Sequence, residues 1–510
     1  MTKVNLDEFQ KTGYDDWLWL IKNSLKPEEL KTIETQSYSG IGIKPLYTEN
    51  DISDQMRRII RDSGDFPYIR GKSAPDVKNH RWLIIQPLKS DNIFDLNKEL
   101  AANLAIGQNS ILIDFSLLAS IAAQYDYSFA DIFDILFKDI DLSHYPIFFE
   151  NCVDYNFYQF FLSYITNNNI DKDTIEAAFG VDIFSKILNN GIIPITIDQD
   201  FEAISGMIKS VKSNHPKSGI VAINGNNYAE AGAGAIEEIA YSIAQAYEYM
   251  RQLERFDLNL DEIVNQIYFN FSAGSEFFIE IAKLRAARLL WAGILNKCGI
   301  DKSLAKMEMI CQTSEFHQSF LDSDTNMIRN SIAAMSAIIG GSQGLKVNFI
   351  DTEYKNAEFA EFAGNLQLVL LNEAHLTDTI DPLGGSGYIE NLTYQIAKHA
   401  YQLFVEIENR GGFLACLKDG YLQNNLNDLL ISKKEQLANN KSILIGVNKY
   451  PNSNDKFLNN LSSSDLNNII SNLVNTSDDY DLQGNIDGQK INKLLKERPA
   501  ATFEAKVFSN

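Results

Sequence analysis

Eight short apolar runs, separated by longer helical patterns, restrict the fold of this chain more than any other feature. Their residues do not alternate with polar ones, which is typical of parallel strands buried on both faces. The runs are Trp82–Gln86, Ile111–Asp114, Ile147–Glu150, Ile193–Ile197, Ile220–Ile223, Ile267–Phe271, Met307–Cys311 and Leu345–Phe349. Residues 230–251 repeat apolar side chains every three or four positions, which predicts an amphipathic helix between two of these strands.

Eight strand–helix repeats without an obvious edge strand predict an α/β fold, a closed (β/α)8 barrel. Residue patterns alone leave an open doubly wound sheet as the alternative. We assign the barrel to residues 60–425, with an N-terminal extension over 1–59 and a polar C-terminal appendage over 426–510.

A short amphipathic helix is predicted in the N-terminal extension. Its apolar face consists of Tyr14, Trp17, Leu18, Ile21 and Leu25, with Thr12 as the expected cap and Pro27 where the helix should stop. Because tryptophan is costly to leave in water, we expect this face to pack on a partner chain or on the outside of the barrel.

The character of the sequence changes after about residue 430. The segments 439–441, 459–465 and 475–479 are polar and rich in Asn, Ser and Asp. One apolar run, Ser442–Val447, predicts a lone strand, and we expect the rest to be a partly ordered appendage with short helices.

Composition narrows the class of protein. The 510 residues carry a formal charge of −22, which argues against a nucleic-acid partner because a polyanion would be repelled. No stretch approaches the about 18 to 20 apolar residues that span a bilayer, and the N-terminus has acids where a signal peptide needs an apolar run. Four scattered cysteines are typical of core thiols in a reducing compartment: Cys152, Cys298, Cys311 and Cys416. We expect a cytoplasmic protein.

The familiar catalytic and metal-binding motifs give no lead. The six histidines form no HxxxH or HExxH pair, and the chain has no GxSxG and no Walker sequence. Residues 232–237 read GxGxxE rather than GxGxxG, which favours a close approach of a helix to the sheet. We therefore expect no metal ligands, and motif chemistry alone predicts a barrel of undefined function.

Longer strings resemble the cobalamin-dependent acyl-CoA mutase family. They are residues 230–233, 276–291, 326–330, 333–335, 340–343 and the Asp-Pro-x-Gly-Gly-Ser segment at 381–393, in the order the family has them. The resemblance implies a (β/α)8 barrel that encloses an acyl-CoA. It also implies a separate flavodoxin-like domain that presents cobalamin over the mouth of the barrel.

Departures from the family pattern fall at positions that touch the substrate in active chains. In the Trp-Thr-Ile-Arg-Gln-Tyr segment of the first strand, Ile85 replaces the arginine and Pro87 the tyrosine. Ser-Gly-Tyr-His on the fifth strand reads Asn224-Gly225-Asn226-Asn227, so both Asn226 and the histidine-replacing Asn227 are changed, although an asparagine amide can still donate. Lys346 replaces a further histidine, whereas Glu373 matches a glutamate of the active barrel. The resemblance thus implies degenerate positions and no catalytic residue.

The family's cobalt-binding Asp-x-His-x-x-Gly sequence is missing, because none of the six histidines has an aspartate two positions before it. The chain reaches the family's linker near 497–504, so we expect the cobalamin domain to be absent and no cofactor to be bound by this chain. The leader at 40–48 resembles that of the small, non-catalytic subunits of methylmalonyl-CoA mutase.

That likeness implies a heterodimer with a large catalytic subunit that holds adenosylcobalamin and interconverts methylmalonyl-CoA and succinyl-CoA in propionate metabolism. On this reading the complex is an isomerase, and this chain alone is inactive. Two alternatives stay open at this point. One is a catalytic barrel served by a separate cobalamin-binding chain, and the other is a free-standing scaffold barrel.

Overall fold

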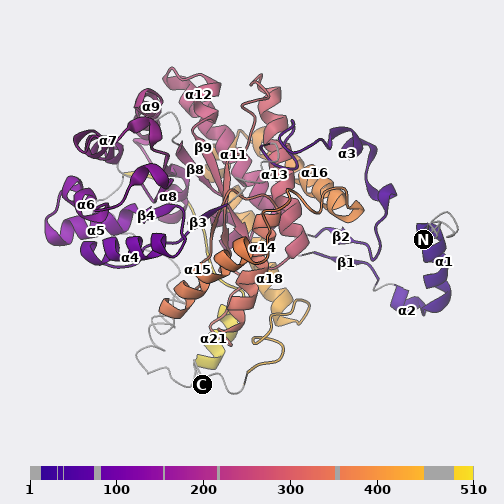
Figure 1. Cartoon of the computed structure of the whole chain (residues 1–510). Helices are drawn as coiled ribbons and strands as arrows, with labels where there is room; N and C mark the ends of the chain where they lie inside the picture. The colour runs from indigo at the N-terminus through magenta and orange to yellow at the C-terminus, as the bar shows by residue number, and fades with distance from the viewer. Residues whose placement is uncertain are drawn as a thin grey trace, which may run out of the picture.

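Eight parallel strands form one sheet in the order β3-β11-β10-β9-β8-β6-β5-β4. The computed structural model describes residues 13–30, 33–37, 40–73, 82–152, 155–214, 219–350, 356–452 and 487–508. The strands are β3 (Leu83–Ile85), β4 (Ile111–Asp114), β5 (Ile147–Glu150), β6 (Ala177–Val181), β8 (Gly219–Asn224), β9 (Ile267–Ala273), β10 (Met309–Thr313) and β11 (Gly344–Lys346). Neighbours in the sheet follow chain order around a cylinder (Figure 1), so the predicted (β/α)8 barrel is confirmed.

The two end strands, β3 and β4, are joined by a seam that uses side chains as well as backbone. Pro87 pairs with Leu112 as a parallel bridge just beyond β3. The Asn109 side chain accepts a hydrogen bond from the Ile84 amide (2.7 Å) and donates one to the Trp82 carbonyl (3.1 Å). One amide side chain thus takes the place of ladder hydrogen bonds, and the barrel closes at this seam.

The fourth barrel strand differs from the sequence prediction. Ile193–Ile197 is not a barrel strand: β7 (Ile192–Pro194) lies outside the barrel sheet, where it pairs antiparallel with β12 (Gly488–Lys490). Strand β6 occupies the predicted place. Its sequence, Ala-Ala-Phe-Gly-Val, has too few β-branched residues to stand out as an apolar run.

Glycine explains why β6 can sit where it does. Gly180 has a φ of +57°, and a β-carbon there would lie 2.0 Å from the carbonyl oxygen of Phe149 on β5. The register between β6 and β8 shifts near the same point, between Ala178 and Val181. The strand therefore requires a residue without a side chain at this position.

Helices surround the barrel in a ring. They are α4 (Ile93–Ala105), α5 (Phe115–Tyr125), α6 (Phe129–Leu136), α7 (Phe157–Asn167), α8 (Ile183–Asn190), α9 (Ile197–Asn214), α10 (Asn226–Glu230), α11 (Ala235–Leu253), α12 (Leu260–Val264), α13 (Phe277–Lys297), α14 (Thr325–Ile339), α15 (Asn356–Asn372), α16 (Gly387–Asn409), α17 (Phe413–Lys418) and α18 (Tyr421–Ala438). Helix α16 packs on α11 and α13.

The helix predicted over 230–251 is divided in two. The short α10 ends at Glu230, and α11 begins only at Ala235, after Gly232 adopts a φ of +102°. The buried apolar side chains of α11 face the barrel strands and α16, so the amphipathic pattern itself is confirmed.

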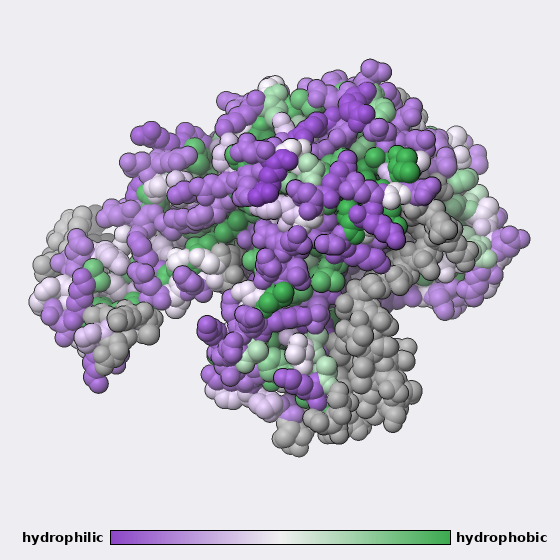
Figure 2. All heavy atoms as spheres, turned by 180° about the vertical axis from the view of Figure 1, so that it is seen from behind, coloured by the Kyte–Doolittle hydropathy of each residue, from purple (hydrophilic) through white to green (hydrophobic). Residues whose placement is uncertain are grey.

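The N-terminal extension begins as an arm, α1 (Tyr14–Ser24) and α2 (Pro27–Leu30), that stands apart from the barrel (Figures 1 and 2), and its later part packs on α16. It also contains the hairpin of β1 (Thr35–Gln36) and β2 (Gly42–Ile43), and α3 (Asp54–Ile59). The predicted cap Thr12 lies outside the described residues, and Gly13 caps α1 with its amide bonded to Asp16 (2.8 Å). No residue of α1 is buried, so its apolar face does not line the barrel.

At the other end, α18 runs across the predicted boundary at 425/426. The lone strand predicted at Ser442–Val447 is wrong: the segment is a turn with one bridge between Ile445 and Lys449. Residues 487–508 carry β12 and a last helix, α21 (Ala501–Phe508). Within the described parts of the chain, no helix has the length and apolarity needed to cross a membrane.

Candidate functional site

Barrel enzymes place their reacting groups where the strands end, at the carboxyl mouth. Strand register identifies which side chains point into the lumen there, because paired residues of parallel strands face the same side. Lys346 pairs with Ile85 on one side and with Gln312 on the other. Likewise, Asn270 pairs with Asn224. These positions, together with Asp114 and Glu150, form the last inward layer.

An ion pair crosses this layer. The ammonium of Lys346 lies 2.8 Å from Glu150 Oε2 and 3.1 Å from Oε1. Lys346 belongs to β11 and Glu150 to β5, with β3 and β4 between them in the barrel wall. The two side chains are 16% and 27% exposed, so water still reaches them. The pair thus spans the lumen at the height where a barrel substrate would react.

Apolar side chains stand at positions 85 and 87 of the first strand, where the family pattern has an arginine and a tyrosine. Ile85 is 1% exposed, and its Cδ1 lies so close to Gly344 that a β-carbon there would be 2.9 Å away. Pro87 forms the seam with Leu112. Neither side chain can donate a hydrogen bond or carry a charge, so this side of the mouth cannot hold an anion.

The two asparagines at the start of α10 differ in their surroundings. The Nδ2 of Asn227 donates to Ser185 Oγ (2.7 Å), and its Oδ1 accepts from the ammonium of Lys496 (2.8 Å). Both polar atoms of Asn227 are therefore engaged within the chain. Asn226 Oδ1 is buried without a hydrogen-bond partner. Sequence reasoning missed Lys496, because it lies in a segment assigned to the polar appendage.

A buried carboxylate lies beside them. Asp182 caps α8 and accepts hydrogen bonds from Gln245 Nε2 (2.8 Å) and Asn224 Nδ2 (3.0 Å), and from Ser185. Burial raises the pKa of this carboxyl, although its hydrogen bonds oppose the shift. An aspartate directly before an apolar run is an N-cap signal that could have identified Asp182 from sequence.

Glu230, at the end of α10, is a second buried acid near the mouth. It accepts hydrogen bonds from Ser314 Oγ (2.8 Å) and the Glu315 amide (3.1 Å). Burial, followed by repulsion from the Glu315 carboxylate, raises the pKa of Glu230 to about 7, while Lys496 acts in the opposite direction. Its charge therefore changes near neutral pH.

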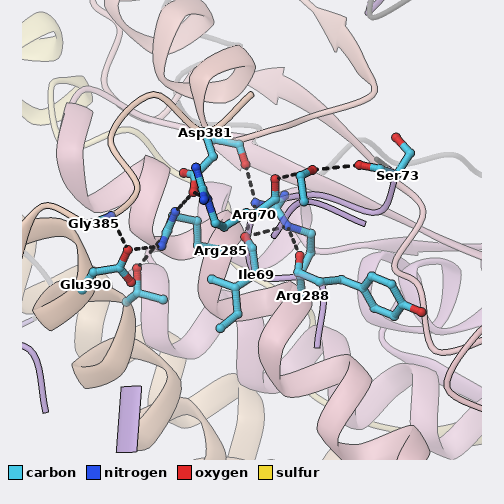
Figure 3. Close-up of polar contacts among 12 residues, drawn as sticks. Ile69, Arg70, Ser73, Arg285, Arg288, Asp381, Gly385 and Glu390 are labelled. Atoms are coloured by element: carbon cyan, nitrogen blue, oxygen red, sulfur yellow. Dashed lines mark hydrogen bonds and ion pairs between the residues drawn. The ribbon is translucent and has the colours of Figure 1, made fainter. Parts of the chain in front are cut away.

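The strings that resemble the mutase family meet in a buried ionic cluster (Figure 3). Arg285 is fully buried and donates to Glu390 (2.6 Å), which also accepts from the Gly385 amide (2.8 Å). Asp381 contacts Arg285 and accepts from Arg70 Nε (2.9 Å). The cluster ties α13, the Asp381 turn, α16 and the loop before β3 together.

Arg288, one turn further along α13, serves the same purpose through backbone groups. Its guanidinium donates to the carbonyls of Ile69 (3.0 Å) and Gly340 (2.8 Å). Burial lowers the pKa of Arg288 to about 10. Figure 3 shows Arg288 beside Ile69 and Arg70. These residues hold the architecture together at the amino end of the barrel.

A cavity of about 970 Å³ opens at this amino end, opposite the mouth. Its inner wall is formed by side chains near the starts of the strands: Leu83, Phe148, Ala178, Tyr268 and Ile310. At its rim, Lys72 pairs with Glu308 and Lys212 with Glu262. The large hollow of the barrel therefore lies below the layer that Lys346 and Glu150 cross.

Glu373 does not join the mouth. It is exposed just after the end of α15, beside the loop that leads back to the amino end. The structure thus brings Ile85, Pro87, Asn226, Asn227 and Lys346 to one end of the barrel and leaves Glu373 apart.

The described histidines differ in their surroundings. His317 is partly buried beside a cavity of only about 30 Å³, which has room for little more than water. Of the other described histidines, His144, His375 and His399 are exposed on the surface, and His144 pairs with Asp141. His80 and His215 lie outside the described residues. No group of three His, Cys, Asp or Glu suited to a metal occurs among the described residues.

Comparison with known proteins gives one family. A family model described as methylmalonyl-CoA mutase matches residues 36–497. The methylmalonyl-CoA mutase small subunit of Porphyromonas gingivalis is 28% identical over 87% of this chain and 71% of its own length. The methylmalonyl-CoA mutase of Rhizobium meliloti is 28% identical over 85% of this chain and 63% of its own. The human mitochondrial methylmalonyl-CoA mutase is 26% identical over 86% and 61%.

The chain therefore spans less than two thirds of the length of the bacterial and human mutases just named. Among solved structures, a proline utilization A protein from Bdellovibrio bacteriovorus aligns with a TM-score of 0.29 and 10% identity over 64% of this chain and 33% of its own. That alignment is too weak to bear on the fold.

Proposed function

Because this chain belongs to the methylmalonyl-CoA mutase family, we propose that it is a non-catalytic member of the small-subunit type that supports a catalytic mutase chain. On this proposal it is one component of an isomerase that interconverts methylmalonyl-CoA and succinyl-CoA in the cytoplasm, in propionate metabolism, and the partner carries out the chemistry.

The observation that carries the proposal is the ion pair between Lys346 and Glu150. At position 346 the family resemblance implies a histidine that faces the substrate. This chain has Lys346 there, and its charge is already neutralised by Glu150 inside the lumen. Ile85 and Pro87 add apolar contacts on the neighbouring wall, and Asn227 is bonded at both polar atoms. These described positions of the mouth thus offer neither a free cation nor a phenol to an anionic acyl group.

The expected loss of reaction rate favours inactivity of this chain alone. Removing one preorganised polar contact from a transition state typically lowers the rate by about 10²- to 10³-fold, or about 2.7 to 4 kcal/mol. The first strand alone lacks two such contacts, at Ile85 and Pro87. We propose that adenosylcobalamin is held by the partner, because no histidine of this chain has the aspartate two positions before it that the family's cobalt-binding sequence contains.

The N-terminal arm supports the proposal of a heterodimer. Its helix α1 has no buried residue, although it presents Trp17, Leu18 and Ile21 on one face. An apolar helix face in this position gains stability by packing on a partner. Most of the surface seen in Figure 2 is hydrophilic.

The test is reconstitution. The purified chain, and a catalytic mutase chain from the same genome, are assayed separately and together with adenosylcobalamin and methylmalonyl-CoA. We expect no succinyl-CoA from this chain alone, a complex of equal stoichiometry, and cobalamin absorbance that follows the catalytic chain. A parallel assay adds an isolated cobalamin-binding domain. Turnover by this chain with cobalamin, or with that added domain, would show that the barrel is catalytic.

A further inference from the structure

Residues 487–508 form a strap along the carboxyl rim of the barrel. The strap begins with β12 paired to β7 and continues with the Ile491 amide bonded to the Gly191 carbonyl (2.9 Å). The Leu494 amide then donates to the carbonyl of Leu188 on α8 (3.0 Å). The strap passes Asn227 after β8 and ends against the loop after β10. It therefore follows the rim from α8, after β6, to the loop after β10.

The first part of the strap fits too closely for larger side chains. A β-carbon at Gly488 would lie 2.3 Å from the carbonyl oxygen of Ile193, and one at Gly191 would lie 2.7 Å from Lys493 Cγ. The backbone approach is possible only because both positions are glycine. The backbone at this end of the strap therefore packs directly against residues 191–193.

The far end is anchored by a buried ion pair. Arg498 donates to Glu504 at 2.8 and 2.7 Å, in a two-pronged arrangement. Glu504 is fully buried and also accepts from Ser319 Oγ and the Phe320 amide, both at 2.9 Å. The strap is thus fixed to the loop after β10 by charge-assisted hydrogen bonds.

Between these two ends, the side chain of Lys496 contacts the mouth. Its ammonium donates to Asn227 Oδ1 (2.8 Å), and Glu230 lies close enough for the charge of Lys496 to lower its pKa. Asn227 in turn holds Ser185. While the strap is closed, the polar atoms of Asn227 are unavailable to any ligand.

We propose that residues 487–508 act as a strap that closes the carboxyl mouth of this barrel, and that Lys496 is its latch. Opening the strap frees the Oδ1 atom of Asn227 and uncovers this side of the lumen. The barrel therefore has a closed and an open state, and its mouth accepts ligand or partner groups only in the open one.

Hydrogen–deuterium exchange of the full chain tests the proposal. Exchange is measured at pH 8 for peptides that cover 488–497, in the wild type and in Lys496→Met. Protection is expressed relative to the intrinsic exchange rate. We expect Lys496→Met to lower the protection of the Ile491 and Leu494 amides by about tenfold at pH 8, because a hydrogen bond from a charged group is lost. Lys490→Met, an exposed lysine on β12, is the matched control and should leave protection unchanged.

Two further outcomes decide the matter. If Lys496→Met protects the strap as well as the wild type does, or if both lysine variants lose protection equally, Lys496 is not a latch. A wild-type strap that exchanges at the intrinsic rate would show that the mouth is not closed at all.

Discussion

Lys346 and Glu150 lie on strands separated by two others, yet their charged groups meet at 2.8 Å inside the barrel. The pair fills the lumen at the mouth and satisfies a cation that would otherwise face solvent and ligand. Lys346, which the sequence shows only as the replacement of a family histidine, therefore makes an internal contact in the structure.

Breaking this pair should lower stability modestly, since both side chains keep some water contact. We expect Glu150→Gln to reduce the free energy of unfolding by about 1 kcal/mol. The double variant with Lys346→Met should lose less free energy of unfolding than the sum of the two single variants, because neither charge is then left alone. Chemical denaturation measures the cycle, and Lys98→Met in the exposed pair with Asp95 is the control, with no measurable change expected. Strict additivity would mean that the pair does not couple.

The sequence predicted the barrel because most of its strands are continuous apolar runs, as at Ile111–Asp114 and Ile147–Glu150, where the observed bounds agree. It failed at β6, whose alanines and glycine give no apolar signal. The run at Ile193–Ile197 owes its apolar character to pairing with the strap, a partner about 300 positions away that no local pattern reveals.

The candidate site was predictable only in part. Resemblance identified Ile85, Pro87, Asn227 and Lys346, and the structure brings them to one end of the barrel. Their contacts with Glu150, Leu112 and Lys496 depend on tertiary distances, and the sequence offers no spacing rule for them.

Gly180 gives the sharpest test of how β6 packs. A β-carbon there would meet the Phe149 carbonyl at 2.0 Å, and the residue has a positive φ. Gly180→Ala should therefore lower the free energy of unfolding by about 2 to 4 kcal/mol. Gly206→Ala, in α9 with nothing within 4 Å of the new atom, is the matched control and should raise stability by about 0.4 to 1 kcal/mol. Equal effects at the two glycines would contradict the close approach.

Arg285 should be among the most sensitive positions in the chain. Its loss leaves the buried Glu390 without its cation and leaves the buried Asp381 with Arg70 alone. We expect Arg285→Met to lower the free energy of unfolding by about 3 to 5 kcal/mol, as measured by denaturant titration. Arg410→Met removes an exposed arginine paired with Glu406 and should cost less than about 0.5 kcal/mol. A small effect at Arg285 would show that the cluster does not hold the fold.

The N-terminal arm should matter for assembly more than for the isolated chain. Because α1 has no buried residue, Trp17→Ala should leave the melting temperature of this chain almost unchanged. Burial of the aromatic ring against a partner is worth about 1.5 to 3 kcal/mol, so affinity for the catalytic chain should fall by about 10- to 150-fold. Lys22→Ala, on the exposed side of the same helix, is the control for a titration of complex formation. Wild-type affinity in Trp17→Ala would mean that α1 does not contact the partner.

His317 makes stability depend on pH in a direction that can be worked out. Burial, followed by the charges of Lys433, Arg329 and Lys283, lowers its pKa to about 3 in the folded chain, whereas an unfolded histidine titrates near 6.5. As the pH falls below about 6.5, the unfolded state takes up a proton that the folded state refuses, so stability decreases toward pH 3. This residue alone should contribute a slope approaching about 1.4 kcal/mol per pH unit. Denaturant titrations between pH 7 and pH 4 should show a shallower decline for His317→Gln than for the wild type, while His399→Gln, at an exposed site, keeps the wild-type profile. Parallel profiles for all three proteins would mean that His317 accepts its proton without unfolding the chain.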